Sequence, residues 1–146
     1  METSLPRIGV GAVILNDANE ILLVLRGRQP EKDKWSIPGG KVDLYETLED
    51  TTVREVMEEV GLHIQVKRLL CTAETIDPGR GEHWISVIFE TRVVSGEASN
   101  REEGGALQDV RWFPLPELPD NLASFTWPAI QALRSPGAAA YSGRNE

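Results

Sequence analysis

Three glutamates within five residues constrain this chain most strongly. Glu55, Glu58 and Glu59 stand in the run Arg54-Glu55-Val56-Met57-Glu58-Glu59-Val60-Gly61. In an α-helix, positions i, i+3 and i+4 lie on one side, so the three carboxylates would project together. The opposite side would carry an apolar stripe that the fold must bury, formed by Val53, Val56, Met57 and Val60. The segment therefore predicts an amphipathic helix with one acidic face.

Both ends of this helix are marked in the sequence. Thr47, followed three residues later by Asp50, resembles a capping box at the start. Gly61 can adopt the left-handed conformation that commonly ends a helix. These signals predict a helix from about Thr47 to Val60.

The charge around the helix indicates a cation site. Residues 40–62 hold seven acidic and two basic side chains, a net charge of −5 in a chain whose net charge is −8. Like charges one turn apart repel and raise each other's pKa unless a cation lies among them. Oxygen ligands suit Mg²⁺ or Mn²⁺, whereas zinc favours His and Cys, of which the chain has two and one. An acidic helix face that is simply solvated is the alternative reading.

The spacing of the glycines, glutamates and arginine in this stretch resembles a known signature. Gly40, Glu46 and then Arg54-Glu55-Val56-x-Glu58-Glu59-x-Gly61-Leu62 occupy every fixed position of the Nudix box, the motif of the Nudix hydrolase family. The resemblance covers about residues 5–134. It implies the Nudix fold, an α/β class with an α/β/α sandwich around a mixed central β-sheet. One unfixed position is unusual, since Tyr45 stands where relatives commonly carry Gly, so the loop is expected to enter the helix differently.

The resemblance implies a reaction and leaves the substrate open. It implies a metal-dependent pyrophosphohydrolase that cleaves a nucleoside diphosphate linked to another group, by water attack at phosphorus. Nucleoside triphosphates, ADP-ribose or nucleotide sugars, and dinucleoside polyphosphates all remain candidates. Pro78 resembles the pattern of ADP-ribose-hydrolysing members, or simply shapes a turn. Two alternatives are a catalytically silent Nudix-like domain that senses a nucleotide and an acidic scaffold for protein contacts.

Roles for individual residues follow from the same resemblance. Glu55 and Glu59 correspond to the principal metal ligands, with Glu58 and the carbonyl of Gly39 as further ligands, and Mg²⁺ is the expected ion with Mn²⁺ as the alternative. Arg54 would orient the carboxylates through Glu46. The general base is open between a helix glutamate, Glu59 or Glu58, and a carboxylate of the later loop, where Glu102 is preferred to Glu103.

Candidate substrate contacts lie outside the helix. Arg26 ends a predicted strand where relatives often place an arginine that contacts phosphate, and Arg28, Lys41 and Arg80 are other cations available for phosphates. Aromatic rings stack on nucleobases, and three residues offer them: Trp35, His83 and Trp84. For Trp84, inside a strand, packing in the core is the favoured role.

Apolar runs and turn residues predict the remaining elements. Strands are expected at residues 7–15, 20–26, 35–38, 63–76, 83–94 and 109–113, with a second helix at 124–134. The first two strands should form a hairpin around residues 16–19, and their consecutive apolar residues suggest a sheet covered on both faces. The polar, glycine-containing residues 95–108 form the longest expected loop, and residues 135–146 are expected to be disordered.

Length and charge limit the remaining possibilities. A chain of 146 residues suits one domain, taken as residues 5–134. An acidic pI of about 4.8 argues against nucleic acid polymers and anionic membranes as partners, although a bound metal would still admit a small-molecule nucleotide. Cys71 is the single cysteine and is expected in a buried strand. No signal peptide or membrane span is recognisable, which makes the cytoplasm the expected location. A monomer and a homodimer both remain open.

Overall fold

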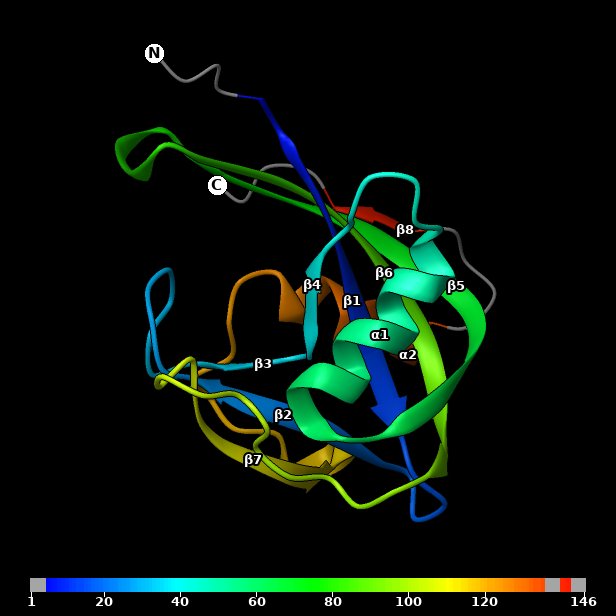
Figure 1. Cartoon of the computed structure of the whole chain (residues 1–146). Helices are drawn as coiled ribbons and strands as arrows, with labels where there is room; N and C mark the ends of the chain where they lie inside the picture. Colours follow the sequence, from blue (N-terminus) through cyan, green and yellow to red (C-terminus); the bar gives the residue numbers. More distant parts are fainter. Residues whose placement is uncertain (1–4, 136–139, 143–146) are drawn as a thin grey trace.

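The computed structural model describes residues 5–135 and 140–142 as a mixed β-sheet with a helix on each face (Figure 1). The strands are β1 (Arg7–Leu15), β2 (Glu20–Arg26), β3 (Trp35–Ser36), β4 (Gly39–Lys41), β5 (His63–Asp77), β6 (Glu82–Ser95), β7 (Leu107–Pro114) and β8 (Ala140–Ser142). The helices are α1 (Leu48–Val60) and α2 (Thr126–Arg134), with short 3₁₀ turns η1 (Pro78–Arg80) and η2 (Leu115–Glu117).

The sheet is mixed in direction, as predicted. Its strands follow the order β3-β2-β1-β6-β5-β8, with β4 paired to β1 and β7 paired to β2. The β1–β6 and β5–β8 pairs are parallel, whereas β1–β2, β2–β7 and β5–β6 are antiparallel. This arrangement confirms the α/β class.

The predicted hairpin of β1 and β2 exists only next to its turn. Leu15 pairs with Ile21, and the amide of Asn16 donates to the carbonyl of Glu20 over 3.1 Å. The two strands then separate, because β1 pairs with β4 and β6 while β2 pairs with β3 and β7. Seven of the nine residues of β1 are buried, in agreement with a strand covered on both faces.

Two hydrophobic clusters fill the space between the sheet and its helices. On one face, Val56 and Val60 of α1 pack with Ala12, Ile14 and Leu22. On the other face, Ala129 and Ile130 of α2 pack with Val13, Leu23 and Ile88. These layers confirm the predicted α/β/α sandwich. Within the described residues, no helix is long and apolar enough to span a bilayer.

The ends of α1 lie where the sequence signals predicted them, but one residue predicted to be buried is exposed. The hydroxyl of Thr47 accepts from the amide of Asp50 over 3.1 Å, and Gly61 adopts a left-handed conformation with φ of 74°. The prediction that Met57 belongs to the buried stripe is wrong, since its side chain is 42% exposed. Thr52 is buried instead, because one residue turns the helix by 100° and Met57 lies just past the edge of the packed face.

Tyr45 precedes α1 in a conformation that favours glycine. Its φ is 71°, and its side chain is 95% exposed. Tyr45 thus keeps the left-handed turn that Gly would give and accepts the steric cost of a side chain there.

The C-terminal residues only partly match the expected disorder of residues 135–146. Residues 140–142 form β8, which pairs in parallel with residues 71–73 of β5. The backbone groups along this side of β5 offer donors and acceptors for a further strand, which explains the difference. Residues 136–139 and 143–146 lie outside the described part of the chain.

Candidate functional site

Arg54 joins the acidic side chains of the motif. Its Nε and one terminal nitrogen donate to the two carboxylate oxygens of Glu46, over 2.8 and 2.9 Å. Its other terminal nitrogen donates to Glu55 over 2.9 Å and to Glu58 over 3.1 Å. The hydrogen bonds from Arg54 are the main reason that the pKa of Glu46 falls to about 2. The predicted contact between Arg54 and Glu46 is therefore present.

Two glycines of β4 allow the helix and the sheet to approach each other closely. A β-carbon on Gly40 would lie 2.2 Å from the carboxyl carbon of Glu55. A β-carbon on Gly39 would lie 2.0 Å from the carbonyl oxygen of Val10 in β1. The obstacle at Gly39 is backbone, so only glycine fits there, whereas a side chain at position 40 would displace the carboxylate of Glu55.

Glu59 is the most unusual carboxylate of the site. Its side chain is 8% exposed, and burial is the main cause that raises its pKa to about 8. The neighbouring carboxylates of Glu102 and Glu55 raise this pKa further, whereas the amide of Gly39 and the charge of Arg26 oppose the rise. Burial also raises the pKa of Glu55. These groups form an anionic cluster that favours a proton or a cation.

The loop at residues 96–106 brings Glu102 to the helix. The amides of Ser99 and Arg101 donate to the carbonyls of Val60 and Glu59, each over 3.0 Å, and so bind carbonyls at the end of α1. The side chain of Asn100 accepts from the amide of Glu102 and donates to the carbonyl of Leu107, each over 3.0 Å. Glu102, the loop carboxylate preferred as a candidate base, thus lies close enough to Glu59 for the two carboxylates to interact.

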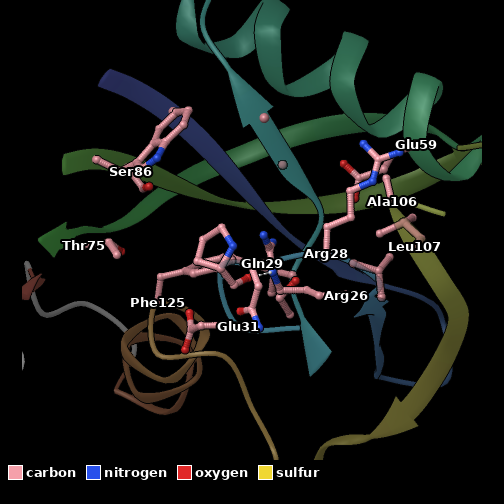
Figure 2. A pocket seen from close by; sticks show the side chains of 18 of the residues that line it. Arg26, Arg28, Gln29, Glu31, Glu59, Thr75, Ser86, Ala106, Leu107 and Phe125 are labelled. Atoms are coloured by element: carbon pink, nitrogen blue, oxygen red, sulfur yellow. Dashed lines mark hydrogen bonds between the residues drawn. The ribbon is translucent and has the colours of Figure 1, made fainter. Parts of the chain in front are cut away.

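Gly39, Gly40, Glu59 and Glu102 line a cavity of about 400 Å³ with two chemically different ends (Figure 2), whereas Arg54, Glu55 and Glu58 lie outside its lining. Figure 2 shows Glu59 and Arg28 at one side of the cavity and Ser86 and Thr75 at the other. The first end also contains Glu102 and Arg26, and the guanidinium of Arg28 donates to the carbonyl of Gly104. The second end is formed by the β5–β6 hairpin. The sequence offered Trp84 as a stacking residue, and it did not point to the other three residues here: Thr75, Glu82 and Ser86.

Some predicted residues lie away from this cavity. Trp35 is only 8% exposed and packs edge-on against Phe113, with 4.9 Å between the ring centres, because β3 directs it into the core. Lys41 is exposed and does not line the cavity; its carbonyl accepts from Arg54 over 3.3 Å. The Glu58 side chain is 54% exposed. Cys71 is buried, as expected.

The position of Trp84 also differs from the one that was favoured for it. It was expected in the core, yet it is half-buried, lines the cavity and belongs to neither hydrophobic cluster. The strand that carries it extends past the region covered by the helices, so its ring meets the cavity instead of a packed layer.

The donor set fits a hard divalent cation in charge and in atom type. Glu55, Glu58, Glu59 and Glu102 supply carboxylate oxygens, and the mutual repulsion that raises the pKa of Glu59 would be relieved by a positive ion. Within the described residues, no three acidic, His or Cys side chains already surround one point. Arg54 explains this, because it holds Glu55 and Glu58 in ion pairs.

The titration of Glu59 predicts how stability depends on pH without metal. The folded protein holds a proton on Glu59 up to about pH 8, whereas an ordinary carboxyl group loses it near pH 4.5. The unfolded chain therefore binds fewer protons between these values, and the free energy of unfolding should fall as pH rises through them. Urea denaturation in a chelator, from pH 5 to pH 9, would measure this decline. It should be shallower in Glu59→Gln, and equal slopes would contradict the prediction.

Comparison with known proteins agrees with the motif and the fold. The NUDIX domain model matches residues 5–133. An ADP-ribose pyrophosphatase of Methanocaldococcus jannaschii is 37% identical over 114 residues, which are 78% of this chain and 65% of that protein. The 8-oxo-dGDP phosphatase NUDT18 of Homo sapiens is 32% identical over 113 residues, covering 76% of this chain and 33% of that protein. The chain thus spans about one to two thirds of the length of these relatives.

A solved structure covers the fold more fully. The MutT NUDIX hydrolase from Burkholderia pseudomallei superposes with a TM-score of 0.79 and 39% sequence identity, covering 88% of this chain and 98% of that one. The residues of the motif, the mixed sheet between two helices and these matches agree with one another. The chain is a member of the NUDIX family.

Proposed function

We propose that this protein is a metal-dependent pyrophosphohydrolase that cleaves a nucleoside diphosphate linked to another group. The observation that carries the proposal is the buried carboxylate of Glu59, which interacts with the carboxylates of Glu55 and Glu102. Glu59 and Glu102 line the same cavity as Arg26 and Arg28. Anionic groups that favour a divalent ion adjoin cations that favour phosphate oxygens. A diphosphate bound with its metal needs both kinds of group at once.

The acidic residues would hold the metal. Nudix hydrolases generally use a divalent metal, and we propose Mg²⁺ here, with Mn²⁺ as a substitute, bound by Glu55, Glu58, Glu59 and the carbonyl of Gly39. When bound, such an ion neutralises phosphate oxygens and lowers the pKa of water so that hydroxide is available near neutral pH. Arg54 would release or reorient Glu55 and Glu58 as positive charge arrives.

Other residues would act on the water and the phosphates. Glu102 is the proposed general base, because its loop is fixed to the end of α1 and its carboxylate interacts with that of Glu59. Glu59 and Glu58 remain the alternatives on the helix. Arg26 and Arg28 line the cavity and would contact the diphosphate.

The relatives narrow the class of substrate. The two relatives are named for activities on ADP-ribose and 8-oxo-dGDP, both of which are nucleoside diphosphate compounds. We therefore propose a small-molecule nucleotide of this kind. The position of Pro78 adds little, since it begins η1 and shapes the turn there. A cytoplasmic location, as a monomer or a homodimer, completes the proposal.

A nucleotide panel tests the function directly. ADP-ribose, 8-oxo-dGDP, nucleoside triphosphates, a nucleotide sugar and a dinucleoside polyphosphate would be incubated with Mg²⁺ and the products separated by chromatography. At least one should be cleaved, with ¹⁸O from labelled water found in a phosphate product and with no turnover in a chelator. Absence of cleavage with both Mg²⁺ and Mn²⁺ would reject the proposal. Tight nucleotide binding by calorimetry without turnover would favour a sensing domain instead.

A further inference from the structure

The hairpin end of the cavity has no part in the chemistry proposed above. It is built by Thr75 at the end of β5 and by Glu82, Trp84 and Ser86 at the start of β6. Figure 2 shows Thr75 and Ser86 across the cavity from Glu59. A substrate whose diphosphate lies near Glu59 would therefore extend another part of itself to this end.

Trp84 is held in one orientation by three neighbours. Its indole nitrogen donates to Oε2 of Glu82 over 3.0 Å, and the guanidinium of Arg7 lies 5.5 Å from the ring centre. Arg7 also pairs with Glu82 over 3.7 Å. A β-carbon on Gly9 would lie 3.3 Å from the benzo edge of the indole, so that edge rests on the backbone of β1. A ring fixed in this way loses little entropy when a flat ligand stacks on it.

The charge at this end selects the kind of group that fits. Two cations line the cavity within the described residues: Arg26 interacts with Glu59, and Arg28 lies beside Glu59 in Figure 2. At the hairpin end, the nearest cation is Arg7, which is already paired with Glu82. Glu82 instead presents a carboxylate, and none of the described residues donates to its Oε1. Arg7 offsets part of this charge through its 3.7 Å contact with Oε2 of Glu82, so this end offers no excess of positive charge to a phosphate. A neutral, flat group with N–H donors on its edge would be favoured by Glu82, Thr75 and Ser86.

We propose that Trp84 stacks on the nucleobase of the substrate and that Glu82 accepts a hydrogen bond from the edge of that base. This rests on the function proposed above and adds a direction to it: the diphosphate lies at the Glu59 end and the base at the hairpin end. The substrate class is then a nucleoside diphosphate derivative that is recognised through its base. Trp84 and Glu82 become specificity-determining residues.

Trp84→Leu tests the stacking by separating binding from turnover. For the best nucleotide of the panel, the variant should raise KM about 10- to 100-fold, the range expected for one base stacked on an aromatic ring, and should leave kcat within about twofold. For an abasic analogue of that nucleotide, with hydrogen in place of the base, wild type and variant should have equal KM. Trp84→Phe should restore most of the affinity. An unchanged nucleotide KM, or an equal loss with the abasic analogue, would overturn the proposal.

Two further variants guard against a general structural effect. Trp127→Leu removes a 46% exposed tryptophan of α2 that does not line the cavity, and it should change neither KM. Ser86→Leu fills the hairpin end without altering Trp84, so it should weaken the nucleotide and spare the abasic analogue, even where Trp84→Leu folds poorly. A Ser86→Leu variant that binds both compounds like wild type would contradict a base at this end.

Calorimetry separates failure of this proposal from failure of the proposed function. The nucleoside monophosphate that carries the same base would be titrated into wild type and Trp84→Leu with Mg²⁺ present. If the panel shows no hydrolysis but wild type binds the monophosphate more tightly than the variant, the function fails and the base site stands. If hydrolysis occurs and the two proteins bind the monophosphate equally, the function stands and the base site fails.

Discussion

Glu59→Gln should lower kcat for the best nucleotide by about 10²- to 10³-fold, the size of effect that follows the loss of one preorganised group that stabilises charge in a transition state. Glutamine keeps the shape of the side chain and can still accept from the amide of Gly39. It removes the negative charge that would bind the metal from a position that is almost fully buried. The loss should therefore appear in catalysis and in Mg²⁺ affinity while the fold is retained.

A second helix acid provides the matched control for this variant. Glu49 lies exposed in the first turn of α1, and Glu49→Gln should leave kcat and Mg²⁺ binding within about twofold. Steady-state kinetics and calorimetry with Mg²⁺ would compare both variants, and urea denaturation would confirm that each is folded. Full activity in Glu59→Gln would exclude this residue from the metal and base roles proposed for it.

Gly39→Ala should destabilise the protein by about 3 kcal/mol, at the upper end of the range for an overpacked position. The added β-carbon would lie 2.0 Å from the carbonyl oxygen of Val10, and this neighbour is backbone in a paired strand that cannot rotate away. Relief requires β4 to move away from β1. That movement would also displace the amide that hydrogen-bonds Glu59, so activity should fall together with stability.

Gly79→Ala is the control for the glycine substitution. A β-carbon at Gly79 would meet its nearest neighbour, a carboxylate oxygen of Asp77, at 3.5 Å, which is ordinary contact. Its free energy of unfolding should stay within about 1 kcal/mol of wild type. Urea denaturation at one pH would measure both variants. If the two alanine variants proved equally stable, the close approach of β4 to β1 would not constrain this fold.

Much of the fold follows from local sequence patterns. The bounds of β1 and β2 match their apolar runs, and α1 begins and ends at the residues marked by Thr47 and Gly61. Such patterns succeed because backbone geometry alone decides which side chains share a face. The contact of Arg54 with Glu46 also follows, since both belong to one short continuous motif.

The remaining errors concern contacts between segments that are distant in the sequence. An aromatic residue in a strand belongs to the core or to a cavity wall according to what covers it. Trp35 was expected to contact a base and is in the core, whereas Trp84 was expected in the core and lines the cavity. The partner strands and helices make that decision, and their placement is a tertiary property. Met57 shows the same limit on a smaller scale. The residues that pack against a helix decide how wide its buried face is, and Met57 lies outside that face.

The hydrogen bonds from residues 99 and 101 to the end of α1 divide the following loop into two regions with different freedom to evolve. Up to Arg101, a changed length would strip partners from the last helical carbonyls and disturb Glu59 itself. From Glu103 to Ala106, after the proposed base Glu102 and before β7 begins, insertions would alter the cavity wall while the helix stays capped. New substrate ranges should therefore arise most easily in these four positions, downstream of the anchor.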